Sequence, residues 1–474
     1  MDRKRLIHFI IMFVLTIGIG FLAPFGQITE LGMKVLGIFI GVLYGWIFID
    51  LIWPSIFGFV ALGCVGLFTA QSAFAAGIGN VQTIMILMTM VFAGAMEEAG
   101  LTGFMADWAL KRKIIRKNPW FLLIGIIVIS YVMGVLGTAM AAIFLLWSLV
   151  IQIADECGIN KKDPLISFMI MMIVIGPMSG SLILPFHGGP LIYLGFLTQA
   201  SNLTIEYIPF MIFGFVITAM AIVLMFIIFK FVFRLDASKF VISEEIIAQL
   251  EAKKSTKAQR ISFVILIIYI AALLLPGIFT KVPEMAFLSK LGIVGVSAIA
   301  LLVMNFIVID GKPLINITKV FTKHIQWPLL LLIAVTFPLA DALKNADCGI
   351  MITITQFIKP IVSGMGVTAF MIVSMILLGL VTQVTHNIVL GAMFIPFLCP
   401  LCAELGGNEF TMWFIIFLVL NAAYVTPAAS MNAAMAHGHE YMVKKNAYIL
   451  GTVYLLITIV LLGVVGIPLG NLVF

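Results

Sequence analysis

Polar residues and helix breakers recur in this chain of 474 residues at one fixed offset, inside segments that are otherwise apolar. Pro177 is followed ten residues later by His187-Gly188, and Pro427 is followed ten residues later by His437-Gly438. The second set thus lies 250 positions after the first, and the same offset relates two further pairs, Gly137-Thr138 and Asn387-Ile388. Breaks in apolar helices free backbone N–H and C=O groups to bind a solute. The matching breaks predict two related halves, each supplying part of one binding site.

The residue types at these breaks suit a small anion. Half-helices that end inside an apolar layer direct their free N–H groups and a partial positive charge toward one place, so no Lys or Arg is needed. The candidate substrate-binding residues are Gly137, Thr138, Ser179, Ser181, His386, Asn387, Thr426, Pro427 and Ser430. Backbone carbonyls at the same breaks can coordinate Na⁺. The candidate ion-binding positions are Gly134, Gly137, Thr385, Asn387 and Ala428.

Two interpretations of His386 stay open. An ionisable group at a break could bind an anion when protonated or couple transport to protons. A neutral imidazole could instead satisfy loop carbonyls with its two ring nitrogens.

The sequence His437-Gly-His439-Glu440 offers only three ligands with no partner motif, so we expect no metal site there. Glu97, Glu98 and Asp341 are expected to be solvated carboxylates at helix ends, and three deeper amides (Gln82, Gln383 and Asn421) fit either interhelical hydrogen bonds or a cavity wall.

Other chemistries lack the residues that they require. Cys399 and Cys402 have redox spacing but lie in an apolar segment without thioredoxin-like context, so we interpret them as core residues. We find no phosphate-binding glycine loop with its Lys, and we expect no cofactor. The net charge of +6 does not indicate nucleic-acid binding, because the basic residues follow a membrane pattern.

The composition predicts an all-α polytopic membrane protein. The chain is 63% hydrophobic and only 10% charged, and long apolar runs recur from residue 6 to residue 470. We expect about 11 transmembrane helices, and we interpret the N-terminal segment as a retained first helix. The early spans are predicted near residues 6–24, 30–49, 51–70 and 82–98, followed by an interfacial helix over 101–117.

Two long apolar segments with breaks in the middle are predicted to be re-entrant hairpins, at about 120–155 and 366–405. Each precedes a broken helix, at about 165–200 and 410–436. The predicted first repeat is 1–234, the cytoplasmic linker is 235–260 and the second repeat is 261–474. Equal order with opposite entry side defines an inverted-topology repeat.

The distribution of charge predicts orientation. With the N-terminus in the cytoplasm, all but five of the 27 Lys and Arg residues fall on the cytoplasmic side. The exceptions are Lys34, Lys281, Lys290, Lys344 and Lys359. We therefore expect a multi-pass protein of the cytoplasmic membrane whose C-terminus lies outside the cytoplasm.

With its hairpins, broken helices and the Val425–Lys445 stretch, the chain resembles the divalent anion–sodium symporter family of the ion transporter superfamily. The resemblance implies a homodimer with scaffold and mobile transport domains, an elevator motion, Na⁺ as coupling ion and a dicarboxylate, citrate or sulfate as substrate. The tips depart from that family's Ser-Asn-Thr pattern, since the first keeps only Thr138 and the second only Asn387. Open alternatives are coupling to H⁺, anion exchange, and a cation/proton antiporter on the same fold; a channel or an intramembrane enzyme is disfavoured.

Overall fold

The computed structural model describes residues 3–101, 103–105, 118–201, 203, 206–243, 245, 248, 252, 254–279 and 282–474. The described residues are almost entirely helical, with a single two-stranded hairpin among them, β1 (Val308–Ile309) with β2 (Lys312–Pro313). Asp310 and Gly311 at its turn both have positive φ, as a two-residue type I′ turn requires. The predicted interfacial helix over 101–117 lies mostly outside the described residues.

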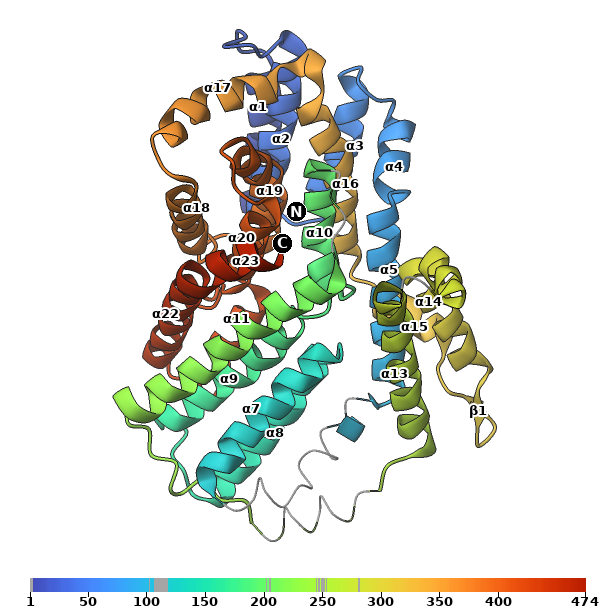
Figure 1. Cartoon of the computed structure of the whole chain (residues 1–474), viewed down its shortest axis with the longest axis vertical. Helices are drawn as coiled ribbons and strands as arrows, with labels where there is room; N and C mark the ends of the chain where they lie inside the picture. Colours follow the sequence, from blue (N-terminus) through green and yellow to red (C-terminus); the bar gives the residue numbers. More distant parts are fainter. Residues whose placement is uncertain are drawn as a thin grey trace.

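The N-terminal part forms α1 (Arg3–Gly20), α2 (Glu30–Phe48), α3 (Trp53–Cys64), α4 (Ala70–Ile78) and α5 (Val81–Glu98). α1 packs along α2, and α3 and α4 pack against α16 (Trp327–Lys344) (Figure 1). The predicted span over 51–70 is shorter than expected, because Gly66 adopts a positive φ that ends the helix before α4 begins.

The first hairpin and broken helix form where the apolar pattern predicts them. They are α7 (Pro119–Val135), α8 (Ala139–Glu156), α9 (Pro164–Gly180) and α10 (Gly188–Ala200), followed by α11 (Tyr207–Ile227) with a π-helical end, η2 (Ile228–Val232). Asn118 and Asp163 cap the N-termini of α7 and α9 with their side chains, and a Pro follows each cap at the first helical position. The break begins after Gly180, whereas Pro177 lies inside α9 rather than in the break.

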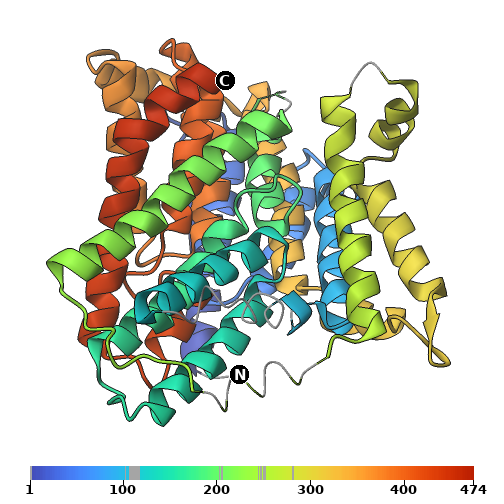
Figure 2. The ribbon, with the colours of Figure 1, turned by 60° about the horizontal axis from the view of Figure 1, so that its bottom comes forward.

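Next come α13 (Lys257–Ile278), α14 (Pro283–Phe306), α15 (Ile317–Lys323) and α16, a 3₁₀ turn η3 (Ala346–Cys348), and α17 (Ile350–Ser363). The second hairpin is α18 (Val367–Val381) with α19 (Asn387–Glu404). The second broken helix is α20 (Glu409–Asn421) with α21 (Met431–His437). α22 (Lys444–Leu461), π-helical η4 (Leu462–Gly466) and α23 (Ile467–Val473) end the chain. Figure 2 shows α13 and α14 beside α5 at one edge of the molecule.

By length and composition, nine helical segments among the described residues are able to cross a membrane. Five shorter apolar helices accompany them, and four of these are the first arms of the hairpins and of the broken helices: α7, α9, α18 and α20. The architecture is therefore a polytopic helical membrane fold. Its element order of hairpin, broken helix and long helix occurs twice.

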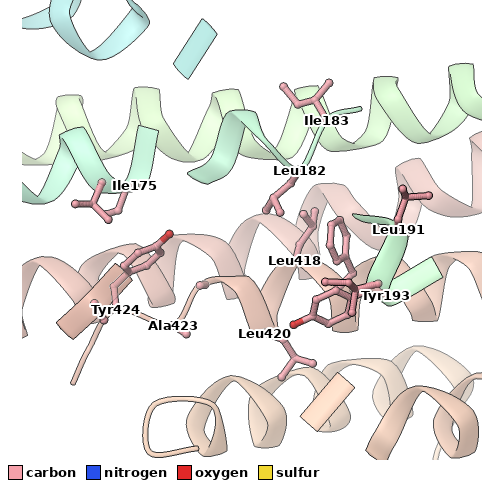
Figure 3. Packing of buried hydrophobic residues seen from close by; sticks show 14 of the residues in the cluster. Ile175, Leu182, Ile183, Leu191, Tyr193, Leu418, Leu420, Ala423 and Tyr424 are labelled. Atoms are coloured by element: carbon pink, nitrogen blue, oxygen red, sulfur yellow. The ribbon is translucent and has the colours of Figure 1, made fainter. Parts of the chain in front are cut away.

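The two broken helices form the centre of the core. Nearly every residue of α9 is buried, as are the residues of α20 from Thr411 to Leu420. Figure 3 shows buried side chains of both, with Leu418 of α20 near Tyr193 of α10 and Ile175 of α9 near Tyr424. The Trp413 indole N–H donates to the Tyr193 carbonyl oxygen at 2.9 Å, which ties α20 to α10. Helices that are apolar all round fit a site with protein on every side.

The two halves also meet at the end of α8. The Tyr441 hydroxyl donates to the Asp155 carboxylate at 3.0 Å, and Lys161 forms an ion pair with Glu440. The hydrogen bond within the Lys161–Glu440 pair raises the pKa of Lys161 and lowers the pKa of Glu440. Because both side chains are exposed, the pair adds little stability. The contacts nevertheless join the first hairpin to the loop after α21.

Candidate functional site

The first hairpin tip is a three-residue turn. α7 ends at Val135, Gly137 has φ +82° and Thr138 is the last residue before α8. A left-handed φ at this point is readily adopted only by glycine, so Gly137 makes the reversal possible. The backbone N–H and the hydroxyl of Thr138 both donate to the Met133 carbonyl oxygen at 3.0 Å. The tip is thus closed by its own hydrogen bonds.

The break between α9 and α10 lies against this tip. His187 ends the break, and its Nδ1 lies 3.3 Å from the Ser181 carbonyl oxygen. The Ser181 hydroxyl donates to the Met178 carbonyl oxygen at 2.7 Å. A Cβ on Gly137 would lie 3.6 Å from His187 Nε2, so the imidazole stands beside the tip. The structure therefore places His187 in the site.

The tip and the break share a cavity of about 320 Å³, which lies within the range of small-molecule sites. Two helices begin at its wall: α8, whose first residues Ala139 to Ala141 line it, and α10, whose Gly188 and Gly189 line it. Neither N-terminus has a side-chain cap, and the space beside both glycines is open. Two uncapped helix N-termini at one cavity form a wall that favours an anion. No Lys or Arg is among the described residues that line it.

The opposite wall comes from other elements. α5 contributes residues from Thr89 to Glu97, α13 contributes Tyr269, and the connection between α15 and α16 contributes His324. The imidazole of His324 lies between two carboxylates, with Nδ1 3.7 Å from Glu97 and Nε2 3.2 Å from Glu98. Glu97 is the one carboxylate among the described residues that line the cavity, and it belongs to this wall rather than to the tip.

The second hairpin tip is tied to the second break through Gln383. Its amide oxygen accepts from Val425 N–H at 3.0 Å, and its amide nitrogen donates to the Ala422 carbonyl oxygen at 3.2 Å. The Thr426 hydroxyl donates to the Gln383 backbone carbonyl oxygen. Of the two interpretations for this deeper amide, the interhelical hydrogen bond is therefore the one observed.

Asn387 begins α19 at this tip. Its side-chain oxygen accepts from the next N–H, that of Ile388, at 3.0 Å, and its amide nitrogen donates to Asn421 at 3.4 Å. His386 precedes it, and among the described residues its buried Nδ1 has no hydrogen-bond partner. The neutral interpretation expects both ring nitrogens to bond to loop carbonyls, and no such bond is observed at Nδ1 among the described residues.

The remaining residues of the second break serve mainly local structure. Ser430 caps α21, where its oxygen accepts from Ala433 N–H at 3.1 Å and its hydroxyl donates to the Ala423 carbonyl oxygen at 2.9 Å. Pro427 and Ala428 are exposed. Thr385 is partly buried in the second tip. Among the described residues, none of the predicted site residues of the second half lines the cavity at the first tip.

A sequence model of the family described as "Citrate transporter" matches residues 35–423. The chain belongs to the citrate transporter family. It is thus a membrane transporter rather than an enzyme, and its solute is a small anion. The resemblance noted in the hairpins and broken helices, to a family that carries dicarboxylates, citrate or sulfate, is confirmed at this level.

The fold is also similar to a solved transporter structure. The crystal structure of the YdaH transporter of Alcanivorax borkumensis, described as having an unusual topology, matches with a TM-score of 0.54 and 15% sequence identity. The match covers 99% of this chain and 100% of that one. At this identity the likeness concerns the fold alone. No curated protein sequence matches the chain.

In this citrate transporter family member, the structure brings only part of the predicted site together. Gly137, Thr138 and Ser181 line the cavity. Ser179 points elsewhere, since its hydroxyl lies 2.9 Å from that of Tyr454, and both side chains are buried. Gly134 lies inside α7 against the Pro177 backbone, where its own carbonyl oxygen accepts from Gly137 N–H.

Some of the polar residues at the cavity of this transporter were not apparent from the sequence. Glu97, expected to be a solvated carboxylate at a helix end, is half exposed and also lines the cavity, and nothing in the sequence pointed to His324. His324 and Glu98 are 226 positions apart, and no periodic pattern links them. The cluster His437-Gly-His439-Glu440 is engaged elsewhere, since His437 Nε2 lies 3.1 Å from the Tyr424 carbonyl oxygen and Glu440 pairs with Lys161.

Proposed function

We propose that this chain is a secondary active transporter that moves a di- or tricarboxylate across the cytoplasmic membrane with Na⁺ coupling. The observation that carries the proposal is the pair of uncapped helix N-termini, those of α8 and α10, at one cavity. An anionic group there receives backbone N–H donors and two helix dipoles. Backbone carbonyls at the tips are the proposed Na⁺ ligands.

An elevator motion is part of the proposal. The cavity lies between the set α7 to α10 and the wall of α5 and α13. α7 and α8 pack on α9, which in turn contacts α21 and α22 of the second half. This contact pattern supports a mobile unit of hairpins and broken helices that carries the anion past a static wall. The proposal includes a homodimer, a cytoplasmic N-terminus and an external C-terminus.

The test is uptake into proteoliposomes that contain the purified full chain. Labelled citrate, succinate and sulfate are supplied with an inward Na⁺ gradient, with choline in place of Na⁺, or with an inward H⁺ gradient alone. The expected result is uptake of citrate or another carboxylate that needs the Na⁺ gradient. No uptake of any of these anions under any gradient would contradict the proposal.

A proton-coupled carrier is the second candidate, because two imidazoles, those of His187 and His324, line the cavity. Uptake driven by the H⁺ gradient without Na⁺ would favour it. In that case we expect His386→Gln or His187→Gln to flatten the dependence of uptake on pH, because each removes an ionisable imidazole. Cation/proton antiport would appear instead as Na⁺-dependent H⁺ release without an anion.

A further inference from the structure

The cavity has two chemically different walls. The tip wall presents the N-termini of α8 and α10 and favours negative charge. The facing wall presents Glu97 of α5. A substrate with several carboxylates that spans the cavity meets attraction at one end and a fixed carboxylate at the other.

Glu97 and its neighbour Glu98 differ in how their charge is compensated. Glu98 is bound by Lys319 and by His324 Nε2, and its side chain is only 19% exposed. Glu97 is 52% exposed, and the only described cationic group within ion-pair distance is His324 Nδ1 at 3.7 Å. Because that imidazole carries a charge only when protonated, Glu97 has no permanent cationic partner among the described residues.

His324 is fixed in this position by close packing. Gly94 lies one helical turn before Glu98, and a Cβ on Gly94 would overlap the His324 side chain. The absence of a side chain on α5 at that point lets the imidazole lie between the two carboxylates. The arrangement of Glu97, Glu98 and His324 is thus built into the helix rather than adopted by a loose surface side chain.

Resting on the proposed function, we infer that Glu97 is a specificity-determining residue of the cavity. It disfavours a bare carboxylate at the wall opposite the tip and accepts a neutral, hydrogen-bond-donating group of the substrate, such as a hydroxyl, an amide or a protonated carboxyl. The bound anion therefore has a direction, with its carboxylate at the first tip and its neutral group at α5.

The test compares two ligands of nearly equal size, citrate and its terminal monoamide, which replaces one carboxylate with a neutral donor. Binding of each ligand to the purified full chain is measured at pH 8 from the thermal stabilisation that increasing ligand concentrations produce. The ratio of the two dissociation constants is the quantity compared among wild type, Glu97→Gln and Glu98→Gln.

The expected result is that Glu97→Gln shifts the ratio toward citrate by about tenfold, because the repulsion between two nearby charges is removed. Glu98→Gln is the matched control, since it makes the same charge change one residue away at a carboxylate paired with Lys319. It is expected to change the ratio by less than about twofold, a spread typical of a change away from the contact.

An unchanged ratio in Glu97→Gln, or an equal shift in Glu98→Gln, would overturn the inference, the latter because it would indicate a general field rather than a contact. Should a variant not fold, Glu97→Asp serves in place of Glu97→Gln, with the carboxylate withdrawn by one methylene and a smaller shift in the same direction expected. Failure of the wild type to bind either ligand would count against the proposed function itself. That outcome is distinguishable from failure of the inference about Glu97, in which the wild type binds but the ratio does not shift.

Discussion

Gly134 of α7 lies directly on Pro177 of α9, so that a Cβ on Gly134 would overlap the Pro177 carbonyl group. Pro177 is the first residue of the signature that recurs 250 positions later, yet it lies within α9 and not at the break. In the structure, the backbone of Pro177 is the surface on which α7 packs closely at Gly134. The contact fixes the first tip relative to the break between α9 and α10, and these two segments together form the cavity wall that favours an anion.

Gly134→Ala is therefore expected to destabilise the protein. The added methyl meets backbone atoms, which cannot rotate away, and overpacking of this kind costs about 1–3 kcal/mol. The measurement is thermal unfolding in detergent. Gly18→Ala in α1 is the control, because no atom lies within 4 Å of the position of its Cβ. Equal melting temperatures for the two variants would contradict the packing argument.

Gly188→Ala is expected to have the opposite profile, with an intact fold and weakened binding. No protein atom lies within 4 Å of its Cβ position, so the methyl enters the cavity at the N-terminus of α10. The loss of a hydrogen bond between an anion and a backbone N–H is worth about 1.5–3 kcal/mol. We expect the KM for citrate uptake to rise about tenfold or more. A wild-type KM would remove this helix terminus from the site.

The elements of the fold could be predicted because their patterns are local. Long apolar segments with charged flanks and central breaks indicate hairpins, and α7 and α8 form within a residue or two of the expected limits. Gly137 was identifiable as the tip because a tight reversal favours glycine. The third segment was misjudged, since an apolar run does not reveal the turn at Gly66.

The partners of the polar side chains could not be predicted, because they depend on which helices become neighbours. Ser179 has the residue type of an anion ligand but bonds to Tyr454, which is 275 positions away. Glu97 looks like any carboxylate at a helix end until α15 and the His324 connection pack beside it. Periodicity identifies the buried face of a helix, but it does not identify the helix that covers that face.

Asn387→Ala is expected to abolish uptake without loss of folded protein. The substitution removes the amide that links the second tip to Asn421 and that accepts from Ile388 N–H. Asn408→Ala is the control, since Asn408 caps α20 by accepting from Thr411 N–H at 3.0 Å. Loss of that cap should lower stability by about 1 kcal/mol while uptake persists. The measurements are proteoliposome uptake and size-exclusion yield, and wild-type uptake by Asn387→Ala would exclude the residue from the site.

Ser179→Ala is expected to act on stability rather than on substrate binding. The variant leaves the buried Tyr454 hydroxyl without the partner that lies 2.9 Å away, which costs about 1–3 kcal/mol. Removing both hydroxyls, in Ser179→Ala with Tyr454→Phe, should cost less than the sum of the two single changes, because no polar group is then stranded. Thermal unfolding of the four proteins in this cycle gives the coupling. Additive losses, or a raised KM for citrate in Ser179→Ala with an unchanged melting temperature, would return Ser179 to the list of substrate ligands.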